Sequence, residues 1–205
     1  MYVGHILESK PLPMAQFDTM NVVKVARKHL ESIREPRRRQ ILENFIEHAA
    51  AEARGDYEAL MASCSRNQQQ YAIYGSDFGA PQSYAELEVH YRGLIQANLY
   101  LIHFDVEKLV VGDDVVFLEG IVHQVYPGNL IKPLFGVDVR DEASVYQLTK
   151  RTALTFVFDK DGLGAGEHAY ADGPATAADF VEIAPNDVPA AFYENPFESD
   201  AGDAR

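Results

Sequence analysis

The stretch TFVFDKDGLGAGEHAYADG, residues 155–173, decides the fold of this chain. Its first part reads as an alternating apolar strand, and Asp-Lys-Asp-Gly then forms a turn before a second strand. Because such a hairpin completes a hydrophobic core, its second strand should be apolar too. It carries instead Glu167, His168, Tyr170 and Asp172. We interpret these side chains as belonging to a pocket, with the hairpin as its wall.

Upstream of the hairpin, helical patterns come first and strand patterns follow. We expect helices at about 17–33, 37–54, 56–64 and 83–99, and strands at 67–75, 100–111, 115–126 and 146–158. Helices followed by a run of antiparallel strands are typical of an α+β fold. A long curved sheet with helices on one face leaves a concave interior in which a small molecule can bind.

The chain is long enough for one domain with extensions. We divide it into an N-terminal arm and helix (1–36), the main domain (37–173) with an inserted loop at 127–144, and an acidic C-terminal extension (174–205). The apolar LIKPLFGV of the insertion is expected to cap the pocket or to form a contact between subunits. We expect a homo-oligomer, a dimer or a trimer.

Charge and composition exclude several classes of partner. A net charge of −13 argues against nucleic acid, because binding phosphates requires an excess of Lys and Arg. The single cysteine, Cys64, permits no internal disulfide and suits a reducing compartment. No apolar run has the length of a signal peptide core or a membrane span, so we expect a cytoplasmic protein without membrane contact. No HxH or HExxH spacing is present, and we expect no catalytic metal.

The helix expected at 37–54 provides the first candidate catalytic residue. His48 shares a face with Ile41, Phe45 and Ala49, so His48 and Phe45 point inward if this helix packs on the sheet. A buried imidazole can accept or donate a proton near neutral pH. The alternative is a core histidine that is hydrogen-bonded to a backbone carbonyl.

The strand expected at 115–126 carries Glu119 and His123 on the same face as Phe117. Titratable groups on an apolar face are costly to bury, and such a pair can orient an imidazole for acid/base chemistry. We therefore expect this face to line the pocket. The alternative is that it points to solvent or to another subunit, and that the opposite face, with Val116 and Leu118, is core.

Alternation on the last strand separates two faces. His168 and Tyr170 lie on one face, and Glu167 lies on the other with Ala169 and Ala171. We expect the small alanine face to pack under a helix, and His168 and Tyr170 to line the pocket. Glycines at 162, 164 and 166 weaken the register, and a slip by one residue reverses this assignment.

Three motifs in this order, ARGDYEAL, GDDVVFLEGIVHQVYPG and FVFDKDGLGAGEHAYADG, resemble the nuclear-transport-factor-2-like superfamily over residues 37–172. Within it, the chain is most similar to the SnoaL-like group of polyketide cyclases, with ketosteroid isomerases as cousins. The resemblance implies a cone-shaped half-barrel wrapped by N-terminal helices around a deep apolar pocket. It also implies acid/base chemistry without a metal or an organic cofactor. Other members of the superfamily have no known activity or serve in transport and assembly, and the fold alone does not choose between them.

The resemblance can be carried over residue by residue. The oxyanion-binding tyrosine of the ketosteroid isomerases falls at His48, their base near Ala72 and their protonated acid near Leu154. Neither carboxylate is present, which argues against a ketosteroid isomerase. The Glu-His pair that SnoaL-like proteins carry on the last strand falls at Glu167 and His168.

Two tyrosines, Tyr71 and Tyr74, flank the position of the isomerases' base. A phenol can donate to an oxyanion, or act as a base where a cation lowers its pKa. The candidate cations are Lys150, Arg151 and Arg92. A solvated edge or a salt bridge between subunits explains these cations as well.

These expectations predict a cofactor-independent acid/base enzyme of aromatic-compound metabolism. It would be a lyase, isomerase, cyclase or dehydratase acting on a small apolar aromatic or polycyclic substrate, such as a lignin-derived phenol. His48 and His168 would move protons, Tyr71 and Tyr170 would hold an oxyanion or phenol, and Glu119 would orient His123. The further expected substrate contacts are Phe45, Phe117, Tyr74, Arg92 and Arg151. The alternative is a non-catalytic ligand-binding or assembly module of the same fold.

Overall fold

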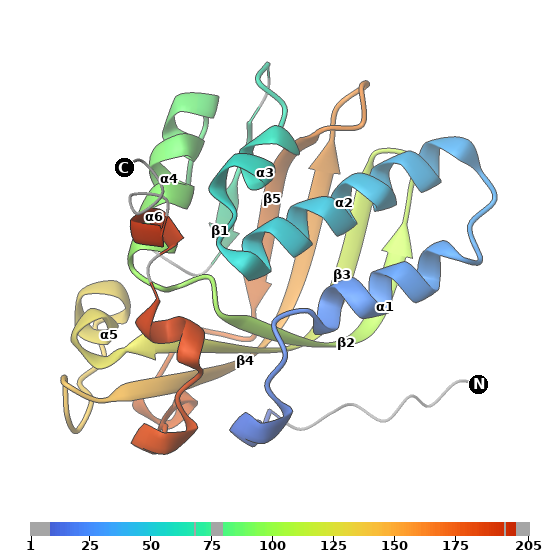
Figure 1. Cartoon of the computed structure of the whole chain (residues 1–205). Helices are drawn as coiled ribbons and strands as arrows, with labels where there is room; N and C mark the ends of the chain where they lie inside the picture. The colour runs from blue at the N-terminus through green and yellow to red at the C-terminus, as the bar shows by residue number, and fades with distance from the viewer. Residues whose placement is uncertain (1–8, 68, 75–79, 195, 200–205) are drawn as a thin grey trace, which may run out of the picture.

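Helices cover one face of a curved, open sheet in this computed structural model, which describes residues 9–67, 69–74, 80–194 and 196–199 (Figure 1). The strands are β1 (Ala72–Tyr74), β2 (Ile102–Val111), β3 (Val115–Pro127), β4 (Val145–Phe158), β5 (Gly164–Ala171) and β6 (Phe180–Glu182). Their order is β1-β5-β4-β3-β2, and β6 pairs with the first half of β4. The predicted α+β class with a curved, unclosed sheet is confirmed. The sheet is not antiparallel throughout, because β1 runs parallel to β5.

The helices follow from local signals in the sequence. They are α1 (Asn21–Leu30), α2 (Pro36–Arg54), α3 (Tyr57–Ala62), α4 (Tyr84–Gln96), α5 (Gly128–Phe135) and α6 (Pro196–Ser199). Pro36 occupies the first turn of α2, where its missing N–H costs nothing, and the Glu35 side chain accepts from the Arg38 N–H. Gly55 ends this helix in the left-handed conformation, with φ of 66°. Asp56 then caps α3 through the Ala59 N–H.

Short 3₁₀ turns connect the remaining parts, at η1 (Met14–Gln16), η2 (Ala177–Asp179), η3 (Pro185–Asp187) and η4 (Ala190–Tyr193). The insertion at 127–144 was expected to be irregular, but its first half is the helix α5. The strand expected at 67–75 is reduced to three residues, and its predicted end at Gly75 lies outside the described residues. Residues 1–8 of the arm and 200–205 of the tail lie outside them as well.

An irregularity in β2 contributes to the curvature of the sheet. The register between β2 and β3 shifts between Val106 and Lys108, as at a β-bulge, and bulges bend the strand that carries them. Gly120 of β3 lies opposite, and a Cβ atom there would lie 2.0 Å from the Asp105 carbonyl oxygen. Only glycine therefore permits this close approach.

The main core lies between the helices α1 and α2 and the concave face of the sheet. Its fully buried side chains include Ile41, Leu42, Val116 and Leu118. A second cluster lies around α3, α4 and the base of the sheet, and a third lies under α5 and β6. No helix in the described ranges has both the length and the apolar character needed to span a membrane.

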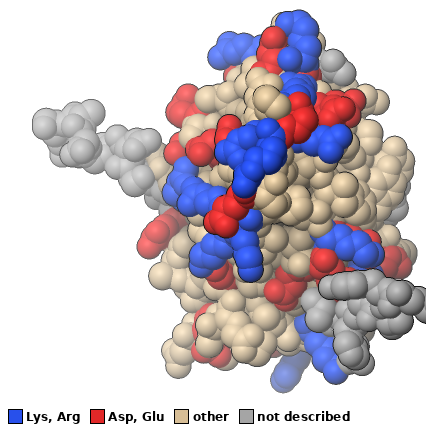
Figure 2. Space-filling view, turned by 90° about the vertical axis from the view of Figure 1, so that its right-hand side faces the viewer, with Lys and Arg blue, Asp and Glu red and all other residues tan. Residues whose placement is uncertain are grey.

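Several charged side chains on the surface form ion pairs. Basic and acidic residues are interspersed on the side of the molecule that carries the turn between α1 and α2 (Figure 2). Arg38 contacts Asp113 at 2.8 Å, and Arg39 contacts Glu43 at 3.0 Å one helical turn away. Exposed pairs of this kind contribute little to stability, typically below about 1 kcal/mol.

Candidate functional site

A cavity of about 100 Å³ lies between α2 and the concave face of the sheet. It is partly open to solvent and is bordered by the start of α1 with the residue Thr19 before it, by the second half of α2 and by the inner faces of β2, β3, β4 and β5. The lining residues are Thr19, Val22, Phe45, Ala49, Glu52, Ala53, Tyr100, Ile102, Phe104, Leu118, Leu154, Phe156 and Glu167. This lining is predominantly apolar and aromatic, as in small-molecule sites generally.

Two carboxyl groups from different elements face this cavity. Glu52 comes from α2, one turn after Ala49, and Glu167 comes from β5. Each side chain keeps part of its surface accessible, and we take this to be the surface that faces the cavity. Within the described part of the chain, neither carboxylate has a hydrogen-bond donor or a cation as partner.

The surroundings of both carboxyls disfavour their charged forms. Burial raises the pKa of Glu52 from 4.5 to about 7. Burial also raises the pKa of Glu167 to about 8, and repulsion by Glu52 adds to this rise. Since the two groups interact, these values describe a pair that still holds protons near neutral pH.

Strand register explains why Glu167 faces inward. Glu167 lies directly opposite Phe156 in the antiparallel pair of β4 and β5, and opposed residues share a face of the sheet. Phe156 lines the cavity, and so does Glu167. The same register places His168 opposite Thr155 and Tyr170 opposite Ala153, on the convex face. The predicted grouping of this strand into two faces, with Glu167, Ala169 and Ala171 on one and His168 and Tyr170 on the other, is the observed one. The prediction was wrong about which of the two faces lines the cavity.

Tyr170 and Tyr74 form a separate aromatic pair on this convex face. Their rings stack at 4.5 Å between centroids, and both side chains are exposed, by 43% and 50% respectively. His168 contacts the Tyr74 ring edge-on, with centroids 6.2 Å apart. The structure thus brings these three predicted site residues together, but away from the cavity.

His48 lies behind the cavity wall, in a chain of buried hydrogen bonds. The Ser63 hydroxyl donates to the Leu60 carbonyl at 2.6 Å, so it accepts from His48 Nδ1–H at 2.8 Å. Nε2 of His48 then accepts from the Tyr91 hydroxyl at 3.1 Å. The Tyr71 and Tyr91 hydroxyl oxygens are 3.0 Å apart. Because the Tyr91 hydroxyl already donates to His48, it accepts here from the Tyr71 hydroxyl.

The hydrogen-bonded side chains of His48, Tyr91 and Tyr71 are all neutral near pH 7. Burial lowers the pKa of His48 to about 4, so its ring is neutral at physiological pH. Burial raises the pKa of Tyr71 and Tyr91 well above the usual value of a phenol. A cation that would make Tyr71 a base, as considered from the sequence, is not found beside its hydroxyl among the described residues.

The pocket face predicted for β3 also needs correction. Leu118 lines the cavity, whereas Phe117, Glu119 and His123 have the opposite parity and lie on the convex face. Glu119 pairs there with Lys108 at 2.7 Å instead of orienting His123. The physical reason is that α2 packs on the uninterrupted apolar face of the strand, where no charge has to be buried.

His123 belongs to a polar network that joins β2, β3 and β4. Its Nε2 lies 3.4 Å from Asp105 Oδ2, and its Nδ1 lies 3.1 Å from Thr149 Oγ1. Asp105 Oδ1 accepts from His103 Nε2–H at 2.9 Å, because His103 Nδ1 already accepts from the Asp18 N–H at 2.9 Å. Burial lowers the pKa of His123, although the attraction of Asp105 opposes this shift.

The two predicted arginine contacts lie elsewhere. Arg151 forms a bidentate pair with Glu107, at 2.7 and 3.0 Å. Arg92 lies on the outer side of α4, with its guanidinium 4.5 Å from the centre of the Tyr57 ring. Of the predicted site residues, Phe45 lines the cavity, and its ring meets Phe156 edge-on at 4.9 Å.

Glu52 was missed by the sequence reasoning, although a signal was present. The inward face of α2 was identified from Ile41, Phe45, His48 and Ala49, and the helical period continues this face to Glu52. A glutamate at the end of an apolar stripe is the signal that was overlooked. Across the described ranges, no group of three or more His, Cys, Asp or Glu side chains is arranged to hold a metal ion.

Comparison with solved structures identifies the fold. A protein described as a SnoaL-like polyketide cyclase from Shewanella putrefaciens superposes with a TM-score of 0.56 at 12% identity, over 82% of this chain and 92% of the other. A structure from Shewanella denitrificans with a similar description superposes with a TM-score of 0.52 at 15% identity, over 67% of this chain and 92% of the other. One from Jannaschia sp. superposes with a TM-score of 0.51 at 14% identity, over 69% of this chain and 91% of the other. No protein-family model matches the chain, and no curated protein matches it in sequence. The chain therefore has the nuclear-transport-factor-2-like fold of the SnoaL-like proteins, as its motifs predicted.

Proposed function

We propose that the cavity binds a small, largely apolar molecule, and that Glu52 and Glu167 transfer protons to and from it without a cofactor. The observation that carries this proposal is that two carboxyl groups, which have no hydrogen-bond donor or cation as partner among the described residues, face one largely apolar cavity. Groups of raised pKa in a cleft are candidates for acid/base catalysis. A core without a ligand would be more stable with apolar side chains at both positions.

The pair can provide a base and an acid at the same pH. A coupled pair that still holds protons near neutral pH can present one ionised and one protonated carboxyl at the same time. Glu52 would accept a proton from carbon next to a carbonyl group of the substrate. The bonding electrons would move to the carbonyl oxygen, which would take the proton of Glu167 and form an enol. Isomerase, lyase, cyclase and dehydratase reactions all start from such species.

The volume of the cavity favours a substrate with a single ring. A cavity of roughly 150 Å³ accommodates benzene in another protein, and the cavity here is about 100 Å³. A small phenol, such as a lignin-derived one, is closer to this size than a polycyclic molecule. The catalytic roles of His48 and Tyr71, a cytoplasmic location and a dimer or trimer stay predictions.

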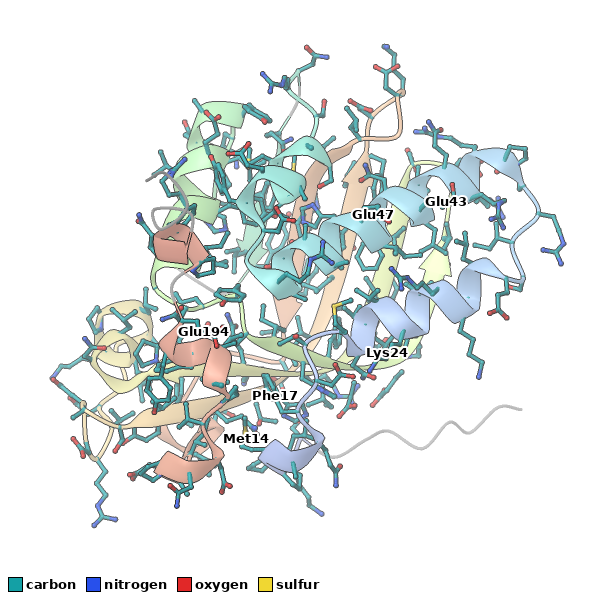
Figure 3. All side chains as sticks on the ribbon, viewed as in Figure 1. Met14, Phe17, Lys24, Glu43, Glu47 and Glu194 are labelled. Atoms are coloured by element: carbon teal, nitrogen blue, oxygen red, sulfur yellow. The ribbon has the colours of Figure 1, made fainter. Side chains whose placement is uncertain are left out.

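The second candidate is a non-catalytic binding module, which the mainly apolar lining favours. Proton exchange on a small ketone separates the two. In D₂O, ¹H NMR would follow the loss of α-hydrogens from cyclohexanone, with Glu52→Gln and Glu167→Gln as test variants. Glu47→Gln is the matched control, because Glu47 lies on the exposed face of the same helix (Figure 3).

We expect the wild-type protein and Glu47→Gln to accelerate exchange, and Glu52→Gln to reduce the rate by about 100-fold, as loss of a general base commonly does. Glu167→Gln should reduce it less, since an amide still donates a hydrogen bond. Exchange by the wild-type protein at the rate of Glu52→Gln would contradict the enzymatic proposal and leave the binding module.

A further inference from the structure

The cavity has acidic groups and no basic ones. Its polar lining residues are Thr19, Glu52, Tyr100 and Glu167, and no Lys, Arg or His is among the described residues that line it. An anionic ligand would therefore meet two carboxyl groups without a compensating cation. Burying an uncompensated charge costs several kcal/mol or more, so the cavity selects against carboxylates and phosphates.

Aromatic rings form much of the remaining wall. Phe45, Phe104, Phe156 and Tyr100 come from α2, β2, β4 and the segment before β2, and they surround the space that the carboxyls face. The face of an aromatic ring carries partial negative charge and attracts ammonium groups. Rings and carboxyls thus favour the same sign of charge.

The two carboxyl groups also have unused capacity to accept hydrogen bonds. Within the described ranges, neither has a donor or a cation, while the exposed acids Asp113 and Glu43 each pair with an arginine. The carboxyl oxygens of both residues keep access to solvent, because they are not among the buried side-chain atoms that lack a partner in the described ranges. A ligand that brings hydrogen-bond donors and positive charge would complete both groups at once.

We infer that the natural ligand of this cavity is a small organic cation, an amine or ammonium compound with an apolar body of about one ring. Its ammonium group binds between Glu52 and Glu167, and its body lies against Phe45 and Phe156. This inference rests on the proposed function only in using the same cavity as the binding site. It names the charge of the ligand, which the proton-transfer proposal leaves open.

Proton release is a signature of this mode of binding. Without ligand, the carboxyl pair holds protons near neutral pH, because burial raises both pKa values. An ammonium group stabilises the carboxylate form and lowers these values, so a proton leaves to the buffer when the cation binds. A neutral ligand of the same shape releases none.

Three probes with one skeleton test the charge directly: benzylamine, benzyl alcohol and benzoate, which are cationic, neutral and anionic near pH 7. Isothermal titration calorimetry in two buffers of different ionisation enthalpy gives both affinity and proton release. We expect benzylamine to bind at least about tenfold more tightly than benzyl alcohol, a difference of about 1.4 kcal/mol. We expect release of protons with benzylamine alone and no measurable binding of benzoate.

The variants locate the effect. Glu52→Gln and Glu167→Gln should each lower the affinity for benzylamine by about tenfold and change the affinity for benzyl alcohol by less than about twofold. Glu47→Gln should change neither. The comparison of the three probes on the wild-type protein does not depend on how the variants fold.

Equal or tighter binding of benzyl alcohol or benzoate would overturn the inference, and so would a failure of all three probes to bind. Its failure is distinguishable from failure of the proposed function. Exchange on cyclohexanone without a preference for benzylamine would refute only the cationic ligand. Tight binding of benzylamine without exchange would refute only the enzyme.

Discussion

The cavity under α2 and the histidine network of β2, β3 and β4 both contain titratable groups in the protein interior. The two regions differ in whether these groups have hydrogen-bond partners within the protein. In the network, His103 has partners at both nitrogens, and Asp105 joins it to His123. In the cavity, Glu52 and Glu167 have no donor among the described residues. The difference teaches that polar groups which the protein itself pairs belong to its architecture, while carboxyl groups that it leaves to the solvent in a pocket are open to a ligand.

The position of the N-terminal arm fits this distinction. The network fixes Asp18 through its N–H, directly before Thr19, which lines the cavity. Met14 and Phe17 lie on the same arm, below α1 (Figure 3), and the Phe17 ring packs 5.9 Å from that of His103. Satisfied polar groups thus hold in place the segment that borders the unsatisfied ones.

The largest effect is expected for the pH dependence of stability. The folded-state pKa of Glu167 is about 8, against 4.5 in the unfolded chain, so between these values the folded state binds more protons. Stability from this group is therefore fully present below about pH 4.5 and is lost as the pH rises toward about 8. Glu167→Gln does not titrate. It should match the wild type at about pH 5 and exceed it by a few kcal/mol at about pH 8.5, since one pKa unit corresponds to about 1.4 kcal/mol.

Urea unfolding at both pH values measures this difference, with Glu47→Gln as control. The exposed Glu47 side chain should give little change at either pH. A Glu167→Gln variant that is less stable than the wild type at the higher pH would mean that the carboxylate has a stabilising partner, and the contrast with the network would disappear.

A smaller effect with the opposite sign is expected in the network. Asp105→Ala removes the acceptor of His103 Nε2–H and the neighbour of His123 Nε2. Leaving buried polar groups without partners should lower the free energy of unfolding by about 2 kcal/mol. Asp105→Asn keeps one acceptor and should cost less. Benzylamine binding by the folded Asp105→Ala protein should remain, because the Asp18 N–H donates to His103 and not to Asp105. Its loss would show that Asp105 is needed to position the segment that borders the cavity.

The smallest effect is expected for Tyr71→Phe. The Tyr71 hydroxyl only donates the last hydrogen bond of the His48 chain, to Tyr91. Its removal should cost about 1 kcal/mol in thermal or urea unfolding. Exchange on cyclohexanone should stay at the wild-type rate, and a large loss of rate would instead support the oxyanion role that the sequence suggested for Tyr71.

The architecture could be predicted from the sequence because its signals are local. Pro36 and Gly55 mark the two ends of α2, and alternation marks the strands. The helix α5 was missed because Pro133 and two glycines read as a loop, yet the helix runs from Gly128 to Phe135 with that proline inside it.

The site was harder to predict because it depends on which strand face meets the helices. Alternation gives two faces and does not say which of them is buried. On β3 and β5, the titratable residues Glu119, His123, His168 and Tyr170 were assigned to the pocket, and all of them lie on the other face. Glu167 was assigned from the sequence to the alanine face, which was expected to pack under a helix, and cross-strand register with Phe156 is what places it in the cavity.

The most direct test of the account is a ¹³C NMR titration of the glutamate carboxyl carbons, with Glu52 and Glu167 assigned from their Gln variants. The account predicts two resonances that titrate far above the usual range, with apparent pKa values of about 7 and about 8, and that shift downward when benzylamine is added. If both carboxyls titrate near 4.5, water solvates them or the protein pairs them in the folded state, and the central claim that burial keeps this pair protonated is contradicted.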